Sequence, residues 1–391
     1  MPWGRSDFER MRERAQVRAF VLCLLTLLSA FGPVPPAAAD DALSDRIGIN
    51  RVNLAWLSRA DQERVLKDIA ASGITHVRLS LSRPVDKSID AIEIAERLGL
   101  KILLEIQLGN KDYYPAAAAP RAGFGRIWDV QRLSDLDLGL YRAQLRSALR
   151  RIDDMGIRID AVEPGNEINY SAYNGDLIVY EKPGRRTPRN ASEVADRSAF
   201  ERGLEAYVAA VRITREELQA TAHNHDALLI SAGLSDVGTS EADHRGMERL
   251  DPSEFISLLQ KRGIDRLVDA YGIHVYPGRK DDAALARYVT TLLGFCRPEG
   301  EGKPCWVTEW GIANTASTCP IDDREREAAV RAVRRSFAEL MEKGRLKAAF
   351  YYDWDTQPVY SVWRCGTLSP AGVTATAADR KTSRSRELLP E

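Results

Sequence analysis

The sequence predicts an α/β protein, a single-domain (β/α)8 barrel of the TIM type with long loops on the C-terminal face and a weak last helix. Eight short segments rich in Ile, Val, Leu and Tyr alternate along the chain with amphipathic stretches. Such nearly continuous apolar character is typical of parallel strands that are buried on both faces. Strands and helices in alternation give right-handed crossovers, and eight strands are enough to close a barrel.

The expected strands each lie between turn residues and an amphipathic stretch. They are Arg46–Leu54, Ile74–Ser82, Leu100–Leu108, Asp160–Asn166, Ala227–Leu234, Val268–Tyr276, Pro304–Trp310 and Leu346–Trp354. An open doubly wound sheet is the alternative arrangement. That fold often carries a glycine-rich phosphate-binding fingerprint, which is missing from this sequence.

The expected helices fill the intervals between these strands. Ser58 and Gly73 are typical of a helix start and a helix end. The helical stretches are Ser58–Gly73, Ser88–Leu98, Leu133–Met155, Ser192–Ala222, Asp251–Arg262, Asp282–Gly294 and Asp323–Lys343. After the last strand only Ala375–Arg384 has a helical pattern, so we expect a weak last helix. The long loops Asn110–Trp128 and Tyr170–Asn190 follow strands and belong to the face where barrel active sites lie.

The N-terminal segment has the pattern of a secretory signal peptide over residues 1–39. A basic lead-in precedes the apolar run Ala19–Phe31, and small residues at Ala37–Ala39 suit a cleavage site. The apolar run is shorter than the ~20 residues that a membrane-spanning helix needs, although an uncleaved anchor is the alternative. We therefore expect a secreted or periplasmic protein with no stable membrane insertion after cleavage. One domain is expected over residues 40–380, followed by a disordered tail at 381–391.

The charge balance argues against one class of partner. The chain has 55 Lys and Arg against 56 Asp and Glu, and its formal net charge is −1. No basic stripe interrupts this balance, so a nucleic acid is not an expected partner. A neutral sugar polymer as partner is neither favoured nor excluded by the charge. Separately, we expect the chain to be a monomer.

Four cysteines follow the predicted leader, and an even count in an exported chain favours disulfides. Cys296 and Cys305 flank a polar turn and are the easiest pair to close, which would leave Cys319 to pair with Cys365. Three connectivities are possible for four cysteines, so this pairing is an expectation. No Cys-x-x-Cys spacing occurs, and we expect neither a metal nor a cofactor. The sequence also lacks the Gly-x-Ser-x-Gly elbow of esterases.

Two glutamates stand at the C-terminal ends of predicted strands on opposite sides of the barrel. Glu167 closes the fourth strand in Glu163-Pro-Gly-Asn-Glu, and Glu309 closes the seventh in Thr308-Glu-Trp-Gly. Two facing carboxyl groups are what glycosidic cleavage requires, one protonated and one ionised. A separation of about 5–5.5 Å gives retention through a covalent intermediate, and about 6.5–9.5 Å gives inversion.

These segments resemble those of clan A glycoside hydrolases. The motifs occur in the clan's order along Ile47–Trp354: the arginine segment Gly73–Leu79, the Asn-Glu segment ending at Glu167, His274-Val-Tyr276, Thr308–Gly311 and Tyr352-Asp-Trp354. The resemblance implies a retaining hydrolase that cleaves a β-linked poly- or oligosaccharide by double displacement. Glu167 would then be the acid/base and Glu309 the nucleophile.

The resemblance also implies roles for the residues around the pair. The substrate-binding candidates are Arg78, Asn166, His274, Tyr276, Trp310 and Trp354. Asn166 would hydrogen-bond the sugar 2-hydroxyl, and Tyr276 would hold Glu309 ionised, with His274 on the same wall. Arg78 would lie beneath Glu309. Trp354 would form the apolar floor under the sugar ring and precede a non-proline cis peptide.

Two departures leave the family within the clan open. Ile168 follows Glu167 where family five members usually have proline, and the third strand ends in Glu105-Ile-Gln107 without that family's histidine. Families five and thirty-nine both remain candidates. Glu163 shares a strand face with Glu167 and is expected to be an inner residue paired with a cation such as Arg78. The alternative functions are a transglycosylase with the same carboxylates and a glycan-binding barrel without turnover.

Overall fold

Eight parallel strands form one sheet in the order β5-β4-β3-β2-β1-β8-β7-β6. The computed structural model describes residues 47–120, 130–177, 190–278, 280–300 and 302–378. The strands are β1 (Ile47–Asn50), β2 (His76–Leu81), β3 (Lys101–Ile106), β4 (Ala161–Pro164), β5 (Leu228–Leu229), β6 (Tyr271–Val275), β7 (Cys305–Trp310) and β8 (Leu346–Tyr351). All eight predicted strands are confirmed. The predicted signal peptide at 1–39 and tail at 381–391 lie outside the described residues.

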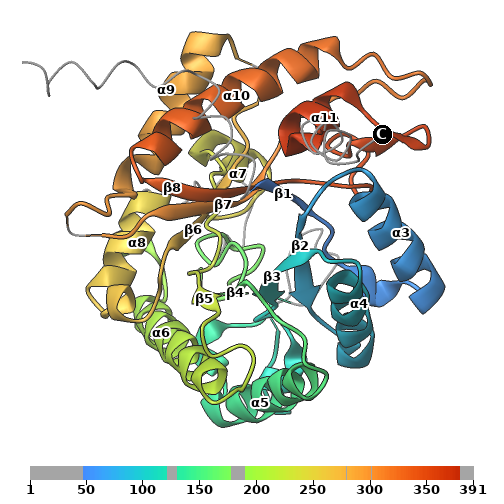
Figure 1. Ribbon diagram of the computed structural model, residues 1–391. Helices are drawn as coiled ribbons and strands as arrows, with labels where there is room; N and C mark the ends of the chain where they lie inside the picture. The colour runs from blue at the N-terminus through green and yellow to red at the C-terminus, as the bar shows by residue number, and fades with distance from the viewer. Residues whose placement is uncertain (1–46, 121–129, 178–189, 279, 301, 379–391) are drawn as a thin grey trace, which may run out of the picture. The chain divides into compact units, whose positions relative to one another are not determined.

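The two ends of this strand order meet through isolated bridges. Ile230, just after β5, pairs in parallel with Ala270, and Leu234 pairs with Ile273 of β6. Because these contacts join the first and last strands of the sheet, the sheet curls into a barrel. The (β/α)8 fold class predicted from the sequence is therefore confirmed (Figure 1).

The helices lie around the outside of the sheet (Figure 1). They are α3 (Arg59–Ala71), α4 (Val85–Arg97), α5 (Leu138–Asp154), α6 (Arg197–Gln219), α7 (Thr239–His244), α8 (Pro252–Gln260), α9 (Asp282–Leu292), α10 (Arg324–Glu342) and α11 (Pro370–Thr376). Short polar side chains begin several of them. Ser58 accepts a hydrogen bond from the backbone N–H of Asp61, and Asp137 accepts two at the start of α5.

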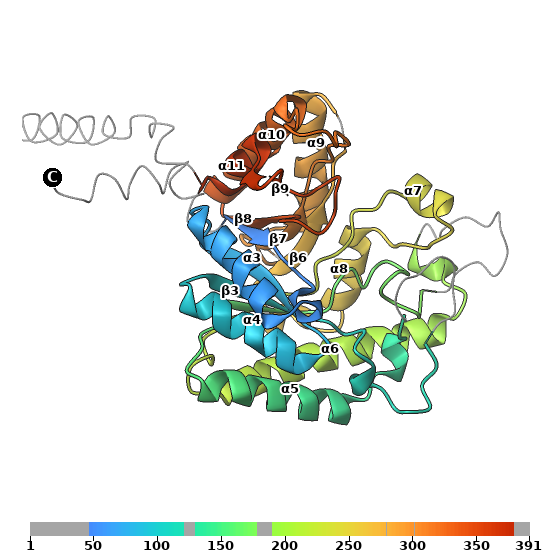
Figure 2. The same ribbon diagram turned by 90° about the vertical axis from the view of Figure 1, so that its right-hand side faces the viewer.

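The last helix and two small elements differ from the sequence prediction. Helix α11 runs Pro370–Thr376 and not from Ala375, because Ser369 caps it and Pro370 suits the first turn. The hairpin of β9 (Trp363–Arg364) and β10 (Thr367–Leu368) was not predicted, and neither was α7. Figure 2 shows α7 beyond the ends of the strands, on the right of the view.

The interior of the barrel has an apolar layer and a charged layer. The apolar layer is a cluster formed by Leu103, Ala161, Ile230, Ala270, Trp306, Ala348 and Phe350. Glu105 and Glu163 follow two residues after Leu103 and Ala161, and both are buried. Because side chains alternate along a strand, these glutamates face the same interior one layer further on. The charged layer supports the site described below.

Two disulfides close late loops. Cys296 pairs with Cys305 across a Cα–Cα distance of 5.4 Å, and Cys319 pairs with Cys365 across 6.0 Å. This is the connectivity that the sequence favoured. Within the described residues no helix is long and apolar enough to cross a membrane.

Candidate active site

Glu309 lies at the end of β7, where two donors hold its carboxylate. Nη1 of Arg78 lies 2.6 Å from Oε1, and the hydroxyl of Tyr276 donates to Oε2 at 2.7 Å. The residue is 8% exposed, so its carboxylate is reachable but mostly desolvated. Each oxygen has a donor aimed at it, which fixes the direction of the group.

Glu167 lies across the barrel mouth and shares a histidine with Glu309. Nδ1 of His274 is 2.9 Å from Oε1 of Glu167 and 3.6 Å from Oε2 of Glu309. Two oxygens at these distances from one atom cannot be further apart than the two distances combined, at most about 6.5 Å. Any angle below 180° at the nitrogen makes the separation shorter. The two carboxyl groups therefore face each other at close range, as the strand positions predicted.

Arg78 of β2 joins the groups of the charged layer. Its Nε lies 2.7 Å from Oε2 of Glu163, which confirms the predicted pairing of that glutamate. Its other two nitrogens donate to Asn50 at 3.0 Å, to Asn166 at 2.9 Å and to Glu309. A planar guanidinium with donors in a fixed fork holds these groups in one geometry, which an ammonium would not.

The charges in this layer shift one another's ionisation. Burial opposes the charged form of Glu309, but the neighbouring His274 and Arg78 outweigh it and lower the pKa of the carboxyl. Burial likewise opposes a charged His274, yet the carboxylates of Glu309 and Glu167 raise its pKa. Burial and the charge of Glu309 raise the pKa of Tyr276 well above its ordinary value. Glu309 is thus kept ionised, and Tyr276 is kept as a donor.

The backbone at Glu167 has an uncommon conformation. Its φ is 46°, in the left-handed region that residues other than glycine seldom adopt, and Gly165 just before it has a φ of 93°. The N–H of Glu167 donates to the carbonyl of Gly233 at 2.8 Å, which holds the turn in place. Such conformations cost about 1 kcal/mol or more and cluster at functional sites.

An extra residue in β7 aims Glu309 into the barrel. Val307 pairs with Ile273 and Glu309 with His274, so β7 has one residue more than β6 over this interval. The same irregularity occurs against β8, between Val307 and Trp310. The side chain of Trp306 faces the interior. Without the extra residue, the two-residue alternation of side chains along β7 would turn Trp310 inward and Glu309 outward. A bulge of this kind beside an active site re-aims a side chain.

Trp310 consequently does not contact the site, and its predicted role in substrate binding is wrong. It is fully buried on the outer side of the sheet. Its ring packs edge-on against Phe337 of α10 at 5.2 Å and against Tyr351 at 4.9 Å. The residue belongs to the packing between sheet and helices.

The ring of Trp354 is not exposed to the site, so its predicted role as the apolar floor is wrong. It is fully buried and stacks on Trp363 with ring centroids 4.8 Å apart. The cis peptide expected after Trp354 joins Tyr352 to Asp353 instead. Tyr352 is half-buried, with its ring 6.1 Å from that of Tyr276. The aromatic residue at the end of β8 that faces the carboxylates is therefore Tyr352, which the sequence analysis did not single out.

His274 and Arg78 lie in the wall of the site, behind the carboxylates. His274 is fully buried and Arg78 is 1% exposed, so they position other groups and do not line the surface as predicted substrate contacts. A Cβ at Gly233 would lie 2.3 Å from Nε2 of His274, so only glycine lets the imidazole fit here. Asn166 and Tyr276 are half-buried and remain at the surface of the site.

A cavity of about 240 Å³ adjoins Asn166 on the side of β1 to β4. Its lining includes Gln107, Gln131, Tyr173 and Trp56. Trp56 is 63% exposed, more than any other large apolar side chain in the described part of the chain. A tryptophan face beside polar amides is a surface on which a sugar ring stacks. The sequence analysis missed Trp56, although its place in the first strand-to-helix loop was a usable signal.

Among the described residues, no group of three or more His, Cys, Asp or Glu is placed to hold a metal ion.

The fold is similar to that of solved glycoside hydrolases. The virulence factor SghA of Agrobacterium tumefaciens, in complex with its substrate analogue salicin, is 13% identical at a TM-score of 0.55, covering 90% of this chain and 99% of that chain. A β-glucosidase from Thermotoga maritima in complex with deoxynojirimycin has 12% identity, a TM-score of 0.55 and the same coverage. A fungal β-1,4-galactanase structure has 14% identity and a TM-score of 0.53, covering 84% and 98%. The sequence matches no protein-family profile and no curated protein.

Proposed function

We propose that this chain is a retaining glycoside hydrolase of clan A that cleaves a β-linked poly- or oligosaccharide. The observation that carries the proposal is the pair Glu167 and Glu309, which share His274 at 2.9 and 3.6 Å. The two facing oxygens are at most about 6.5 Å apart, and this upper bound is the lower end of the range in which inverting enzymes place a water. The likeness of the fold to solved glycosidases supports the same reaction class.

The first step forms a covalent glycosyl intermediate. A carboxylate oxygen of Glu309 attacks the anomeric carbon while the bond to the leaving oxygen breaks, and Glu167 gives that oxygen its proton. The donors Arg78 and Tyr276 keep Glu309 ionised before the attack. One donor on each carboxylate oxygen suits a nucleophile that must be charged in the resting enzyme.

The second step returns the enzyme to its starting state. Glu167, now ionised, takes a proton from water, and the water oxygen displaces Glu309 from the anomeric carbon. Asn166 has its side-chain oxygen bound to Arg78, which leaves its NH₂ to donate toward the sugar 2-hydroxyl. His274 holds Glu167 in reach of the leaving oxygen.

Several finer points belong to this proposal. Families five and thirty-nine are the candidates within the clan, and the protein acts outside the cytoplasm, in the periplasm or secreted, as the N-terminal pattern and disulfides favour. Transglycosylation is the second candidate, because another sugar in place of water would resolve the same intermediate. A glycan-binding barrel without turnover is less well supported, since both carboxylates and their donors are in place.

A panel of aryl β-glycosides and β-linked polysaccharides tests the proposal. We expect release of product with retained anomeric configuration, followed by proton NMR before mutarotation. The accumulation of longer oligomers would indicate transglycosylation. The same substitution at an exposed residue of α7, Glu241→Gln, is the matched control for Glu309→Gln and should leave the rate unchanged. First-formed product of inverted configuration would overturn the retaining mechanism.

A further inference from the structure

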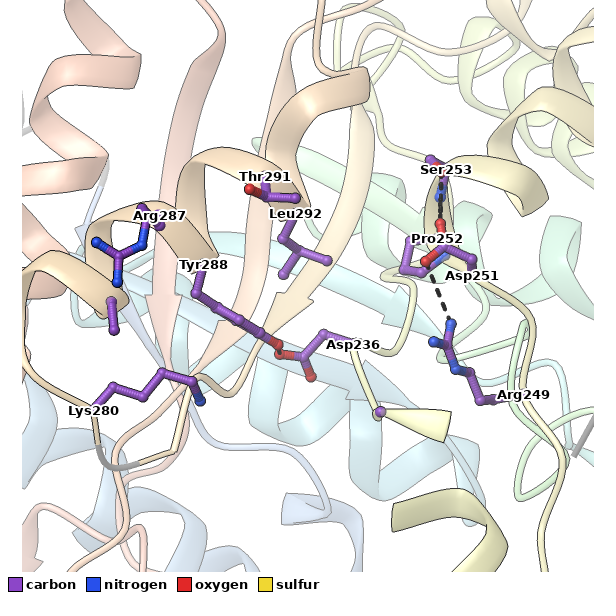
Figure 3. Close-up of a pocket in the computed structure, with 12 residues that line it drawn as sticks. Asp236, Arg249, Asp251, Pro252, Ser253, Lys280, Arg287, Tyr288, Thr291 and Leu292 are labelled. Carbon is purple, nitrogen blue, oxygen red and sulfur yellow. Dashed lines mark hydrogen bonds and ion pairs between the residues drawn. The ribbon is translucent and has the colours of Figure 1, made fainter. Parts of the chain in front are cut away.

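A second cavity opens on the same face of the barrel, between the loop that precedes α8 and the loop that follows β6. Its volume is about 590 Å³. Figure 3 shows its charged and aromatic lining, to which Asp236, Arg249, Asp251, Lys280, Arg287 and Tyr288 contribute. Asp236, Arg249, Asp251 and Lys280 come from the loops that follow strands or precede helices, the part of a barrel that builds binding sites, and Arg287 and Tyr288 come from the middle of α9.

Asp236 connects this cavity to the catalytic wall. Its Oδ2 accepts a hydrogen bond from the backbone N–H of Tyr276 and another from the hydroxyl of Tyr288, both at 2.5 Å. Tyr276 also bonds Glu309. Tyr288 lines the cavity, and Figure 3 shows its hydroxyl against Asp236. Asp236 and Tyr276 thus link the lining of the cavity to the carboxylate of Glu309.

Three cations from separate segments line the cavity, in a chain that is close to neutral overall. Nζ of Lys280 lies 5.0 Å from the ring centre of Tyr288 and donates to the carbonyl of Pro277. Arg287 is exposed on α9. Neither Lys280 nor Arg287 forms an ion pair with a carboxylate in the described part of the chain. Arg249 donates to Thr239 at 3.2 Å and lies 3.5 Å from Asp251.

The two acids of the lining are already occupied. Asp251 caps α8 by accepting from Ser253, and its pKa is lowered because this bonding and Arg249 outweigh the effect of burial. Asp236 takes two donors at one oxygen. The positive charges of Lys280 and Arg287 therefore remain available to an incoming anion.

The rest of the lining suits a sugar. Pro252, Leu292 and the ring of Tyr288 give an apolar surface, while Ser253 and Thr291 add hydroxyl groups. An apolar floor with a few polar groups at the rim is the usual form of a carbohydrate or small-molecule site.

We propose that this cavity binds an anionic sugar unit of the substrate, so that the substrate is an acidic β-linked glycan. This inference rests on the proposed hydrolase function. The anion is a carboxylate of a uronic acid or a sulfate ester, because Lys280 and Arg287 suit both. A neutral chain would leave both cations without a partner.

The test compares a β-linked glucuronan oligosaccharide with its carboxyl-reduced counterpart, which has the same length and no charge. We expect the wild type to hydrolyse the acidic chain with a kcat/KM higher by about 10- to 100-fold. The double variant Lys280→Ala/Arg287→Ala should lose this preference and hydrolyse both chains with similar kcat/KM. Arg331→Ala, exposed on α10 away from the cavity, is the control. Added salt should weaken the preference in the wild type.

A sulfated β-linked oligosaccharide separates the two sources of charge. Preference for the sulfated chain alone assigns the site to a sulfate ester, and preference for the uronate chain assigns it to a carboxylate. Equal rates on all three chains in the wild type would overturn the anionic site and leave the hydrolase intact. If no glycoside is hydrolysed, the proposed function fails. The site can still be tested in that case by calorimetric binding of the acidic chain to Glu309→Gln. Loss of binding on adding Arg287→Glu would support the site, and equal binding to the two variants would refute it.

Discussion

The interior of the barrel contains an apolar layer and a charged layer, which lie two residues apart along the same strands. One layer is apolar and includes Leu103 and Ala161. Two residues along the same strands, Glu105 and Glu163 face Arg78 in the charged layer. The strands are continuous through both layers, and only the side chains change.

The comparison separates residues that stabilise the fold from residues that place the chemistry. Burial of apolar area lowers the free energy of the folded state by ~25 cal/mol per Å². Buried charges lose their hydration and recover it only through well-aligned partners, so their net contribution to stability is small. The charged layer is explained better by what it positions, because Arg78 touches both Glu163 and Glu309.

The largest effect is expected at the proposed nucleophile. Glu309→Gln keeps the size of the side chain but removes its charge, so kcat should fall by at least ~10⁴-fold. The melting temperature should change little by comparison, because the one oxygen of Gln still accepts from Arg78 and its NH₂ can donate to the hydroxyl of Tyr276. Steady-state rates on an aryl glycoside together with calorimetry check both points. Turnover near the wild-type level would exclude Glu309 from the chemistry.

The acid/base should show a different signature. Glu167→Ala removes proton donation, which a good leaving group needs least, so the loss in kcat/KM should be about 10²–10⁴-fold with a poor leaving group and far smaller with dinitrophenolate. Azide should restore the second step and give a glycosyl azide, seen by mass spectrometry. An equal loss for every leaving group would assign Glu167 another role.

The next largest effect is expected at Arg78, which joins the groups of the charged layer. Arg78→Lys keeps one charge but cannot reach Glu163, Asn166 and Glu309 together, so we expect kcat to fall by roughly 10²-fold. Lys101→Arg, exposed at the start of β3, is a control for the exchange of basic residues. If Arg78→Lys lost stability in denaturant and not kcat, the charged layer would be structural.

The apolar layer should behave in the opposite way. Leu103→Ala opens a cavity in a residue that is 1% exposed and should lower the free energy of unfolding by about 2–4 kcal/mol. Its kcat at 25 °C should stay close to that of the wild type, since Leu103 is the neighbour of Arg78 across β2 and β3 but makes none of the hydrogen bonds that hold Glu309. Urea unfolding and rates at the same temperature test the contrast. A loss of kcat comparable to that in Arg78→Lys would remove the distinction between the layers.

The smallest effect is a pH dependence of stability at Glu105. Burial, partly opposed by Arg78, raises the pKa of this carboxyl to about 7. Its usual value is ~4.3, so the folded state holds a proton that the unfolded state has lost. The stabilisation is present below the unfolded value and disappears as the pH rises toward 7. The melting temperature of Glu105→Gln relative to the wild type should therefore rise by a few degrees between pH 5 and pH 8. A constant difference would contradict the raised pKa.

Much of the barrel could be read from the sequence because buried parallel strands have a strong apolar signal. The positions of Glu167 and Glu309 followed, since parallel strands end on one face. The pairing of Glu163 with Arg78 followed from the two-residue period of a strand. These inferences use local patterns that tertiary packing did not override.

The rest depended on events that leave no such pattern. The extra residue in β7 turns Trp310 outward, and the pattern Thr308-Glu-Trp-Gly does not predict this irregularity. The strand β8 ends at Tyr351, so alternation no longer decides which of Tyr352 and Trp354 faces the site. Asp236 acts through contacts with Tyr276 and Tyr288 that only the folded chain brings together.

The most direct test of the central claim is covalent trapping by an activated 2-fluoro β-glycoside. The account predicts a mass increase of one glycosyl unit per chain, with the modified peptide carrying Glu309 and no other labelled carboxylate. The label should not form in Glu309→Gln. Labelling of Glu167 or of another residue, or inactivation without a stable adduct on Glu309, would contradict the assignment.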